Sequence, residues 1–307
     1  MSFIKTYKFA LHYVLKLAGI SPRKIEIEPG TILNFWAPTE ATNTATAARK
    51  SRKPAIVFLH GFAFDGILTW HFQALALAKD YSVYVPDFVF FGDSTTDRTE
   101  RSVVFQAECI AKGLKKLGVD KCTLVGLSYG GMVGFKMAEI YPELVESMVV
   151  SCSVVALTES ISRARLDYIG FNMWEDYLLP DSVKGVETLL QVASESLPKL
   201  PNWIYKEILE GISNYREEKQ ELLKTLVISD EEFTLPSFHQ KIHLLWGKND
   251  RIFDLDTAHN VKQQIGEKAS LEYIKRAGHL VQLDRPFTYN DCLKKILPSL
   301  SSSKPTV

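Results

Sequence analysis

The hexapeptide Gly-Leu-Ser-Tyr-Gly-Gly at residues 126–131 is the most informative stretch of this sequence. An apolar run at residues 122–125 precedes it, and a segment with helical periodicity follows at residues 132–138. Glycines on both sides of the serine permit a tight turn from strand to helix, because no Cβ is present to clash. Such a turn exposes the serine hydroxyl beside the positive end of the helix dipole. The serine could merely cap the helix, but this context favours a nucleophile.

Short apolar runs alternate with helical segments on both sides of this hexapeptide. The predicted strands are residues 55–59, 81–85, 121–127, 145–152, 241–246 and 270–274, and the predicted helices are residues 70–79, 102–117, 129–140, 256–265 and 287–296. Buried strands that alternate with helices predict an α/β protein with a parallel sheet covered on both faces. Residues 24–28 and 31–36 alternate around Pro29-Gly30 and predict a strand hairpin.

The alternation stops after Cys152 and resumes with the predicted strand at residues 241–246. Residues 155–235 have a helical pattern broken by prolines and are too long and too periodic to be an ordinary loop. We therefore predict a first core part at residues 24–154, a helical insertion at 155–235 and a second core part at 236–300. A flexible surface loop is predicted at residues 39–53, and a disordered tail at 301–307.

The amino-acid composition limits the kinds of binding partner that we expect for this protein. The chain has 307 residues, of which 46% are apolar, enough for a sizeable core. Lysine plus arginine equals aspartate plus glutamate at 36 each, so the overall charge gives no reason to expect nucleic acid or an anionic membrane as partner. The four cysteines, at positions 109, 122, 152 and 292, lack metal-like spacing. We expect a reduced, cytoplasmic protein without metal or cofactor.

The amino terminus carries a further helical pattern. Residues 9–20 are apolar but are interrupted by His12 and Lys16, and they are too short to span a bilayer. No small-residue cleavage site follows them, so a secretory signal is not expected. We predict an N-terminal helix within residues 1–23. Packing on the domain is the favoured role, and weak contact of residues 3–20 with a membrane surface is the alternative.

A serine nucleophile needs a base, and the base needs an acid that orients it. After the serine, the chain order should be acid and then base, each on a loop that follows a later strand. Asp250 follows the predicted strand at residues 241–246, and His279 follows the strand at 270–274. Either residue alone could be a helix cap or a surface group. Together, in this order, they predict a catalytic triad of Ser128, Asp250 and His279.

A tetrahedral intermediate needs two backbone N–H donors. The residue after the nucleophile, Tyr129, should supply one of them. The second should come from the loop His60-Gly61-Phe62 after the first parallel strand, with the N–H of Phe62 as the natural donor. His60 is interpreted as a structural histidine that braces this loop, because His279 already fills the role of the base.

These motifs resemble the α/β-hydrolase superfamily, and the resemblance covers nearly the whole chain. It rests on His60-Gly61-Phe62, the glycine-flanked Ser128, the segment Trp246-Gly247-Lys248-Asn249-Asp250, and Gly278-His279. The resemblance implies an α/β-hydrolase fold with an eight-stranded, mostly parallel sheet, helices on both faces and a helical cap. Within the superfamily, the chain is similar to monoacylglycerol-lipase-like and carboxylesterase-like proteins, and to uncharacterised plant hydrolases.

One segment departs from the pattern of the superfamily. Many members have Asp-x-Pro-Gly-x-Gly-x-Ser after the fourth strand, whereas this chain has Val89-Phe90 in place of Pro-Gly. The change is expected to alter the lining of the pocket rather than the triad. Phe64, Phe90 and Phe91 are accordingly predicted to line an apolar substrate pocket.

The motifs favour hydrolysis of a carboxylic ester with an apolar acyl group, such as a monoacylglycerol, through an acyl-enzyme. Superfamily members that open epoxides use aspartate where this chain has Ser128, and hydroxynitrile lyases commonly carry lysine where it has Leu280. Carbon–carbon bond hydrolases share the triad and remain an alternative. So does a hydrolase-like receptor for a small molecule, although such receptors usually lack the glycine found here at Gly131. A non-catalytic interaction protein is a further alternative. It predicts that an active-site probe such as a fluorophosphonate does not label the protein.

Overall fold

The computed structural model describes residues 2–39 and 53–300 of the chain. The predicted tail at residues 301–307 lies outside the described residues. The same holds for the predicted surface loop at residues 39–53, apart from its two end residues.

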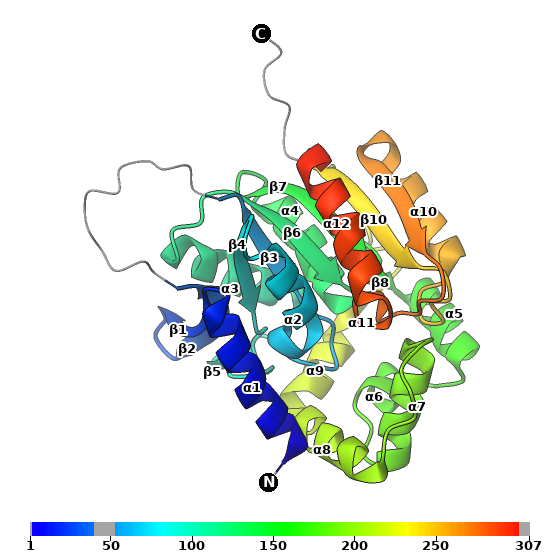
Figure 1. Cartoon of the computed structure of the whole chain (residues 1–307). Helices are drawn as coiled ribbons and strands as arrows, with labels where there is room; N and C mark the ends of the chain where they lie inside the picture. Colours follow the sequence, from blue (N-terminus) through cyan, green and yellow to red (C-terminus); the bar gives the residue numbers. More distant parts are fainter. Residues whose placement is uncertain (1, 40–52, 301–307) are drawn as a thin grey trace, which may run out of the picture.

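A central sheet organises the molecule (Figure 1). Eight strands follow one another in the order β1-β2-β4-β3-β6-β7-β10-β11, and the short β5 pairs with β2 as a ninth strand. Their bounds are β1 (Ile20–Glu28), β2 (Thr31–Pro38), β3 (Ala55–Leu59), β4 (Ser82–Pro86), β5 (Thr95–Thr96), β6 (Cys122–Leu127), β7 (Val145–Ser151), β10 (Lys241–Gly247) and β11 (Ala269–Ile274). From β4 to β11 all neighbours are parallel, whereas β2 pairs antiparallel with β1, β4 and β5. The predicted fold class is confirmed.

Helices cover both faces of this sheet. On one face α2 (Gly66–Leu77) packs against α12 (Pro286–Leu300), next to the short α11 (Val281–Asp284). On the other face α3 (Val103–Lys116) packs against α4 (Tyr129–Ile140), and α10 (Leu255–Ile265) packs on β10 and β11. Because both faces are covered, the central strands are largely buried and mainly apolar, and β3 is a continuous apolar run.

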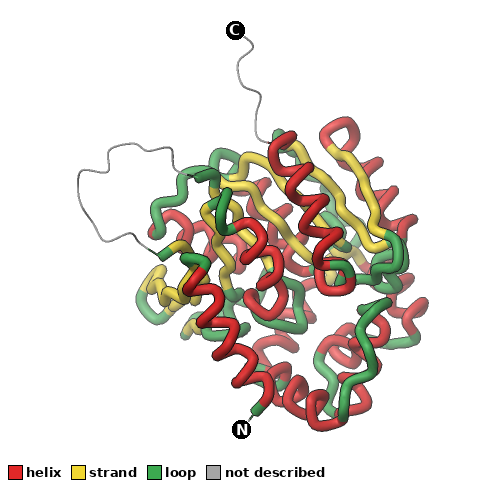
Figure 2. The backbone as a smooth tube through the Cα atoms, in the orientation of Figure 1, coloured by secondary structure: helices red, strands yellow, loops and turns green. Residues whose placement is uncertain are grey.

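The elements between β7 and β10 form a separate helical layer below the sheet in the view of Figure 2. They are β8 (Leu157–Thr158), α5 (Glu159–Ile169), α6 (Trp174–Leu178), α7 (Val183–Ala193), α8 (Asn202–Ile212), α9 (Arg216–Leu226) and β9 (Val227–Ile228). The two short strands pair in parallel and close the base of the layer. We call this layer the cap.

The N-terminal helix differs in extent from its prediction. It runs as α1 (Phe3–Leu17), and Leu11 and Leu15 are buried against the domain, so one face of the helix packs on the core. It starts early because Glu207 of the cap accepts hydrogen bonds from the first two helical N–H groups. Gly19, at φ +80°, ends it, so residues 20–23 belong to β1 and not to the N-terminal helix.

Candidate active site

Ser128 lies at the sharp turn between β6 and α4, as predicted. Its backbone has φ +52° and ψ −119°, a region that costs a non-glycine residue about 1–3 kcal/mol. The turn persists because the Ser128 carbonyl accepts the N–H of Gly131 at 2.8 Å and the hydroxyl of Ser153 at 2.6 Å. A strained backbone held by its surroundings is typical of a functional position.

The flanking glycines are required by close packing rather than by their backbone angles. A Cβ on Gly126 would lie 2.6 Å from the carbonyl oxygen of Gly130. A Cβ on Gly130 would lie 2.2 Å from the carbonyl oxygen of Leu59 at the end of β3. The helix therefore starts directly on the neighbouring strand, and this contact brings Ser128 next to the loop that follows β3.

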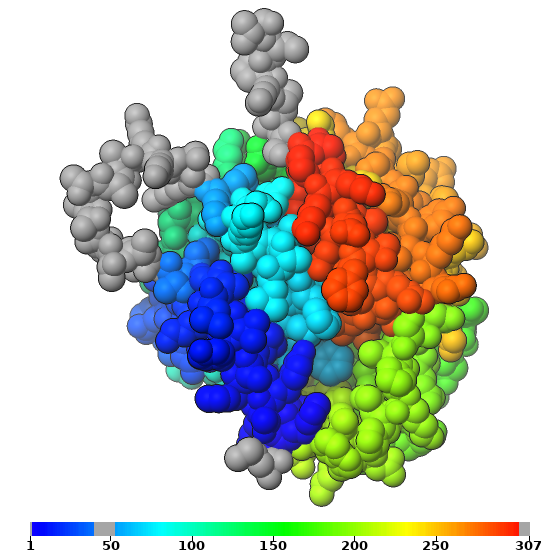
Figure 3. Space-filling model, in the orientation of Figure 1, coloured from blue at the N-terminus to red at the C-terminus, as the bar shows by residue number. Residues whose placement is uncertain are grey.

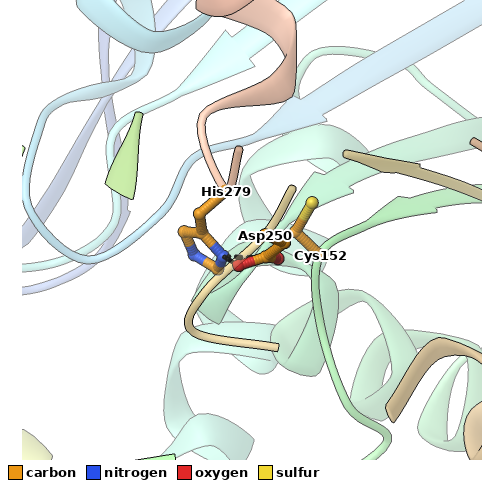
Figure 4. A group of neighbouring side chains, drawn as sticks. All are labelled: Cys152, Asp250 and His279. Atoms are coloured by element: carbon orange, nitrogen blue, oxygen red, sulfur yellow. Dashed lines mark hydrogen bonds and ion pairs between the residues drawn. The ribbon is translucent and has the colours of Figure 1, made fainter. Parts of the chain in front are cut away.

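His279 and Asp250 form the second part of the site (Figure 4). His279 Nδ1 donates to Asp250 Oδ2 at 3.0 Å and to Oδ1 at 3.2 Å. Asp250 Oδ1 also accepts the N–H groups of Ile252 and Phe253, and the carboxylate is fully buried. These contacts hold the imidazole with its proton on Nδ1, so the lone pair of Nε2 is available as a base.

Cys152, directly after β7, lies beside this pair (Figure 4). Its Sγ, a carboxylate oxygen of Asp250 and a ring nitrogen of His279 all lie within 4.8 Å of one another. Burial is the main cause that raises the pKa of the Cys152 thiol well above its ordinary value, and the Asp250 charge adds to it. The thiol is therefore protonated at neutral pH, whereas a metal ligand would be the thiolate. We therefore interpret Cys152 as a residue that packs beside Asp250, and not as a metal ligand.

Ser128 and His279 face one cavity without touching. Both line it, but the described residues include no hydrogen bond between the Ser128 hydroxyl and the imidazole. Catalytic hydrogen bonds are often long in structures without substrate and tighten when substrate binds. Two of the three predicted groups, Ser128 and His279, thus line one cavity, and Asp250 is buried behind the imidazole.

The loop after β3 forms another part of the wall of this cavity. A Cβ built on Gly61 would lie 3.7 Å from the Ser128 Cβ, so this loop runs directly against the serine. Phe62 and Tyr129, the two predicted N–H donors, line the same cavity. Tyr129 is the first residue of α4, where the helix itself offers its N–H no acceptor.

His60 has the structural role that was predicted for it. Its Nε2 accepts the N–H of Phe88 at 3.0 Å, and its Nδ1 donates to the carbonyl of Gly61 at 2.7 Å. Burial lowers the pKa of His60 to about 4, so the ring is neutral at physiological pH. The ring ties the loop after β3 to the loop after β4.

The cavity itself is largely apolar and lies between the sheet and the cap. The polar side chains in its lining include those of Thr69, Ser128 and His279. The core contributes Phe62, Phe64, Met132, Ile252, Phe253 and Leu280, and the cap contributes Leu157, Trp174, Tyr177, Leu178, Leu189, Ala193 and Leu226. A cavity of this kind suits an apolar group that ends at the serine.

Two of the three predicted pocket residues lie elsewhere. Phe64 lines the cavity, but Phe90 and Phe91 do not. Phe91 is buried behind Phe62, with ring centroids 5.2 Å apart, and Phe90 packs under the guanidinium of Arg101 at 4.3 Å. Phe91 also lies beside Tyr129, so it supports the cavity wall from behind, whereas Phe90 points to Arg101 and Tyr215.

The sequence did not reveal the role of Asp284. Its buried carboxylate accepts the N–H of Gly278, immediately before His279, at 2.7 Å. It also accepts the N–H of Glu195 in the cap at 2.9 Å and the hydroxyl of Ser194. Asp284 therefore fastens the histidine loop to the cap.

Comparison with known proteins identifies the family of this chain. The profile of the family described as alpha/beta hydrolase fold matches residues 54–286. The chain belongs to this family. It is 23% identical to epoxide hydrolase 4 of Homo sapiens over 287 residues, which covers 84% of this chain and 76% of that protein. It is 32% identical to the pimeloyl-[acyl-carrier protein] methyl ester esterase of Aeromonas hydrophila over 172 residues, or 52% of this chain and 65% of that protein.

A solved structure gives the same fold. The putative lipase Lip1 of Acinetobacter baumannii matches this α/β hydrolase with a TM-score of 0.81 at 18% identity, covering 96% of each chain. At this identity the likeness concerns the fold alone. These relatives come from an animal and from bacteria, so the resemblance to monoacylglycerol-lipase-like and plant proteins stays a prediction. Among the described residues, no helix is long and apolar enough to cross a membrane.

Proposed function

We propose that this α/β hydrolase cleaves carboxylic esters that have an apolar acyl group. The observation that carries the proposal is the position of Ser128. It is held in a strained turn in the wall of an apolar cavity, which is also lined by an imidazole that a buried carboxylate fixes. A serine beside an oriented base, with backbone donors nearby, is the arrangement that acyl transfer requires.

In the proposed mechanism the Ser128 hydroxyl attacks the ester carbonyl while His279 Nε2 takes its proton. The negative charge passes to the carbonyl oxygen, which the N–H groups of Phe62 and Tyr129 and the start of α4 stabilise. The C–O bond to the alcohol then breaks, and His279 returns the proton to the departing oxygen. Water, deprotonated by His279, attacks the acyl-enzyme, and the acid leaves as Ser128 regains its proton.

The nucleophile distinguishes this proposal from epoxide opening, although an epoxide hydrolase is among the relatives. A covalent alkyl-ester route needs a carboxylate as nucleophile, and the turn carries the hydroxyl of Ser128. The esterase among the relatives acts on a methyl ester of an acyl group, as its name says. The apolar cavity favours medium-chain acyl esters, and a monoacylglycerol is the concrete candidate.

The test is hydrolysis of p-nitrophenyl esters from acetate to laurate by wild type and by Ser128→Ala. We expect many turnovers, a preference for acyl chains longer than acetate, and a loss of about a thousandfold or more in kcat for the variant. Multiple turnovers that survive in Ser128→Ala would refute the mechanism. Binding of esters without turnover by the wild type would instead favour the receptor-like or carbon–carbon bond alternatives.

A further inference from the structure

The outer face of α1 is apolar, in addition to the face that packs on the domain. Its large exposed side chains are Phe3, Tyr7, Phe9, Tyr13, Val14 and Leu17, of which Phe9 is 79% exposed and Leu17 is 72% exposed. Phe3, Tyr7, Val14 and Leu17 follow a helical spacing of three, four and seven residues, so they form one stripe. Soluble surfaces seldom expose a contiguous apolar stripe of this length unless a partner covers it.

The exposed apolar surface continues beyond α1. Phe3 packs edge-on against Trp203 of α8, at 5.5 Å between ring centroids, and Trp203 is itself half exposed. On the other side Tyr7 contacts His71 of α2, next to the exposed Phe72. We call the exposed apolar residues of α1, together with Trp203 and Phe72, the α1 surface. It extends over three elements, unlike the narrow seam that a single helix would present to a coiled-coil partner.

The charges of α1 select one kind of partner. The helix contains three lysines and no aspartate or glutamate, although the whole chain has no net charge. Lys5 and Lys16 are exposed beside Phe9, while Lys8 pairs with Asp65. The other carboxylate that contacts α1, Glu207, is occupied by N–H groups at the helix start. An apolar face bordered by lysines matches an anionic bilayer surface, whose headgroups attract cations while its acyl region takes up aromatic side chains.

The parts of the chain outside the described residues do not fit this surface. Residues 40–52 read Glu-Ala-Thr-Asn-Thr-Ala-Thr-Ala-Ala-Arg-Lys-Ser-Arg, and residues 301–307 read Ser-Ser-Ser-Lys-Pro-Thr-Val. Apart from Pro305 and Val307, neither segment has an apolar side chain larger than alanine to cover the aromatic rings. An occupant from outside the chain is therefore required.

We propose that the α1 surface docks the protein on an anionic lipid bilayer, with α1 lying in the plane of the interface. Asp65, which pairs with Lys8, adjoins Phe64 in the cavity wall, so docking would bring the membrane close to the apolar cavity. Figure 3 shows the molecular surface hollowed between α1, α2 and the cap segment α7–α8. The docking does not depend on the proposed esterase activity, because it needs neither Ser128 nor His279.

The experiment is co-sedimentation of the full chain with vesicles of phosphatidylcholine, with or without phosphatidylserine. Wild type should bind the mixed vesicles more tightly, by about fivefold for each lysine that reaches the surface, and high salt should weaken that binding. The double variant Phe9→Glu/Leu17→Glu should bind at least about tenfold more weakly, because two exposed apolar side chains no longer enter the bilayer. Both positions are exposed, so circular dichroism and ester hydrolysis in solution should remain unchanged.

A matched pair of tyrosines controls for the effect of added charge. Tyr13 is 64% exposed on α1, and Tyr168 is 63% exposed on α5, on the opposite side of the view in Figure 1. Tyr13→Glu should weaken vesicle binding, and Tyr168→Glu should not. The proposal is overturned if wild type does not sediment with mixed vesicles or if both glutamate variants behave alike. It is also overturned if the wild type is a dimer that Phe9→Glu/Leu17→Glu dissociates, because a second copy would then cover the α1 surface.

Discussion

At the scale of single residues, Asp250 combines two tasks. One carboxylate oxygen accepts backbone N–H groups of its own loop, and both oxygens accept from His279. The loop thus fixes the Asp250 carboxylate, and the carboxylate in turn orients the His279 ring. Asp284 acts on His279 indirectly. Its carboxylate accepts the N–H of Gly278, the residue before His279, and the N–H of Glu195 in the cap. The position of His279 depends on both carboxylates.

Replacement of Asp250 by asparagine tests this dependence. Asparagine keeps the shape but offers an amide, which no longer stabilises the imidazolium or fixes the proton on Nδ1. We expect kcat for p-nitrophenyl ester hydrolysis to fall by about a thousandfold to ten-thousandfold with the fold intact. A kcat within tenfold of wild type, in a folded variant, would show that Asp250 is not the acid of the triad.

His60 should make the fold sensitive to acid. Its pKa is lowered to about 4 by burial, against an ordinary value of 6.5, so the native state favours the neutral ring. The stabilisation is fully present above pH 6.5 and is lost as the pH falls from there through 4. From pH 7 to pH 4.5 the loss in free energy of unfolding is about 2 kcal/mol from this residue.

Urea unfolding at both pH values, for wild type and His60→Gln, measures this contribution. The drop in stability between pH 7 and pH 4.5 should be about 2 kcal/mol larger for wild type than for His60→Gln. Equal drops in the two proteins would mean that the ring is not buried in its neutral form.

At the scale of elements, the turn between β6 and α4 depends on how closely the helix approaches β3. Gly130→Ala would place a methyl group 2.2 Å from the backbone oxygen of Leu59, which cannot move without disturbing the sheet. We expect a loss of about 2–4 kcal/mol in the free energy of unfolding, and weaker catalysis because Ser128 shifts.

Gly211→Ala is the matched control, because it also lies in a helix but has no atom within 4 Å of the added Cβ. Alanine there should be neutral or stabilising by up to about 1 kcal/mol. Thermal and urea unfolding of the two variants give the comparison. Similar stabilities for both would contradict the packing of α4 on β3.

Elements that are buried on both faces or bounded by caps were predictable from the sequence. β3 and α4 coincide with their predicted ranges, because the strand is a continuous apolar run and the helix begins directly after the serine. Ser2 caps the start of α1 locally. The contact of Glu207 with the first helical N–H groups was not predictable, because Glu207 lies more than 200 residues away and no local pattern reveals it.

The candidate site likewise contains residues that were predictable from the sequence and residues that were not. The proximity of the loops that carry Ser128, Asp250 and His279 was predictable, because each follows a buried strand and parallel strands bring such loops to one edge of a sheet. Phe90 and Phe91 were misplaced because position in the chain does not tell whether a loop turns toward the cavity or beneath it. Cys152 and Asp284 gave no signal, since their roles arise from partners that only the folded chain brings near.

At the scale of the whole molecule, the core protects all four cysteines, which are unpaired and buried. Cys109 and Cys152 have no exposed surface, Cys122 has 1% and Cys292 has 8%. Burial also raises the pKa of the Cys109 and Cys122 thiols to about 12, so reactive thiolates are scarce.

We therefore expect 5,5′-dithiobis(2-nitrobenzoic acid) to modify at most Cys292 in the native protein within the time of the assay. All four thiols should react in guanidinium chloride, which serves as the control. Rapid modification of two or more thiols without denaturant would show that the core opens more readily than this packing implies.

The most direct measurement of the catalytic assignment is labelling with a fluorophosphonate, followed by intact-protein mass spectrometry and peptide mapping. If Ser128 is an activated nucleophile, wild type gains a single adduct on the peptide that contains Ser128. Ser128→Ala should then gain none, and Asp250→Asn should label much more slowly. The assignment is contradicted if folded wild type does not react, or if the adduct maps to another residue.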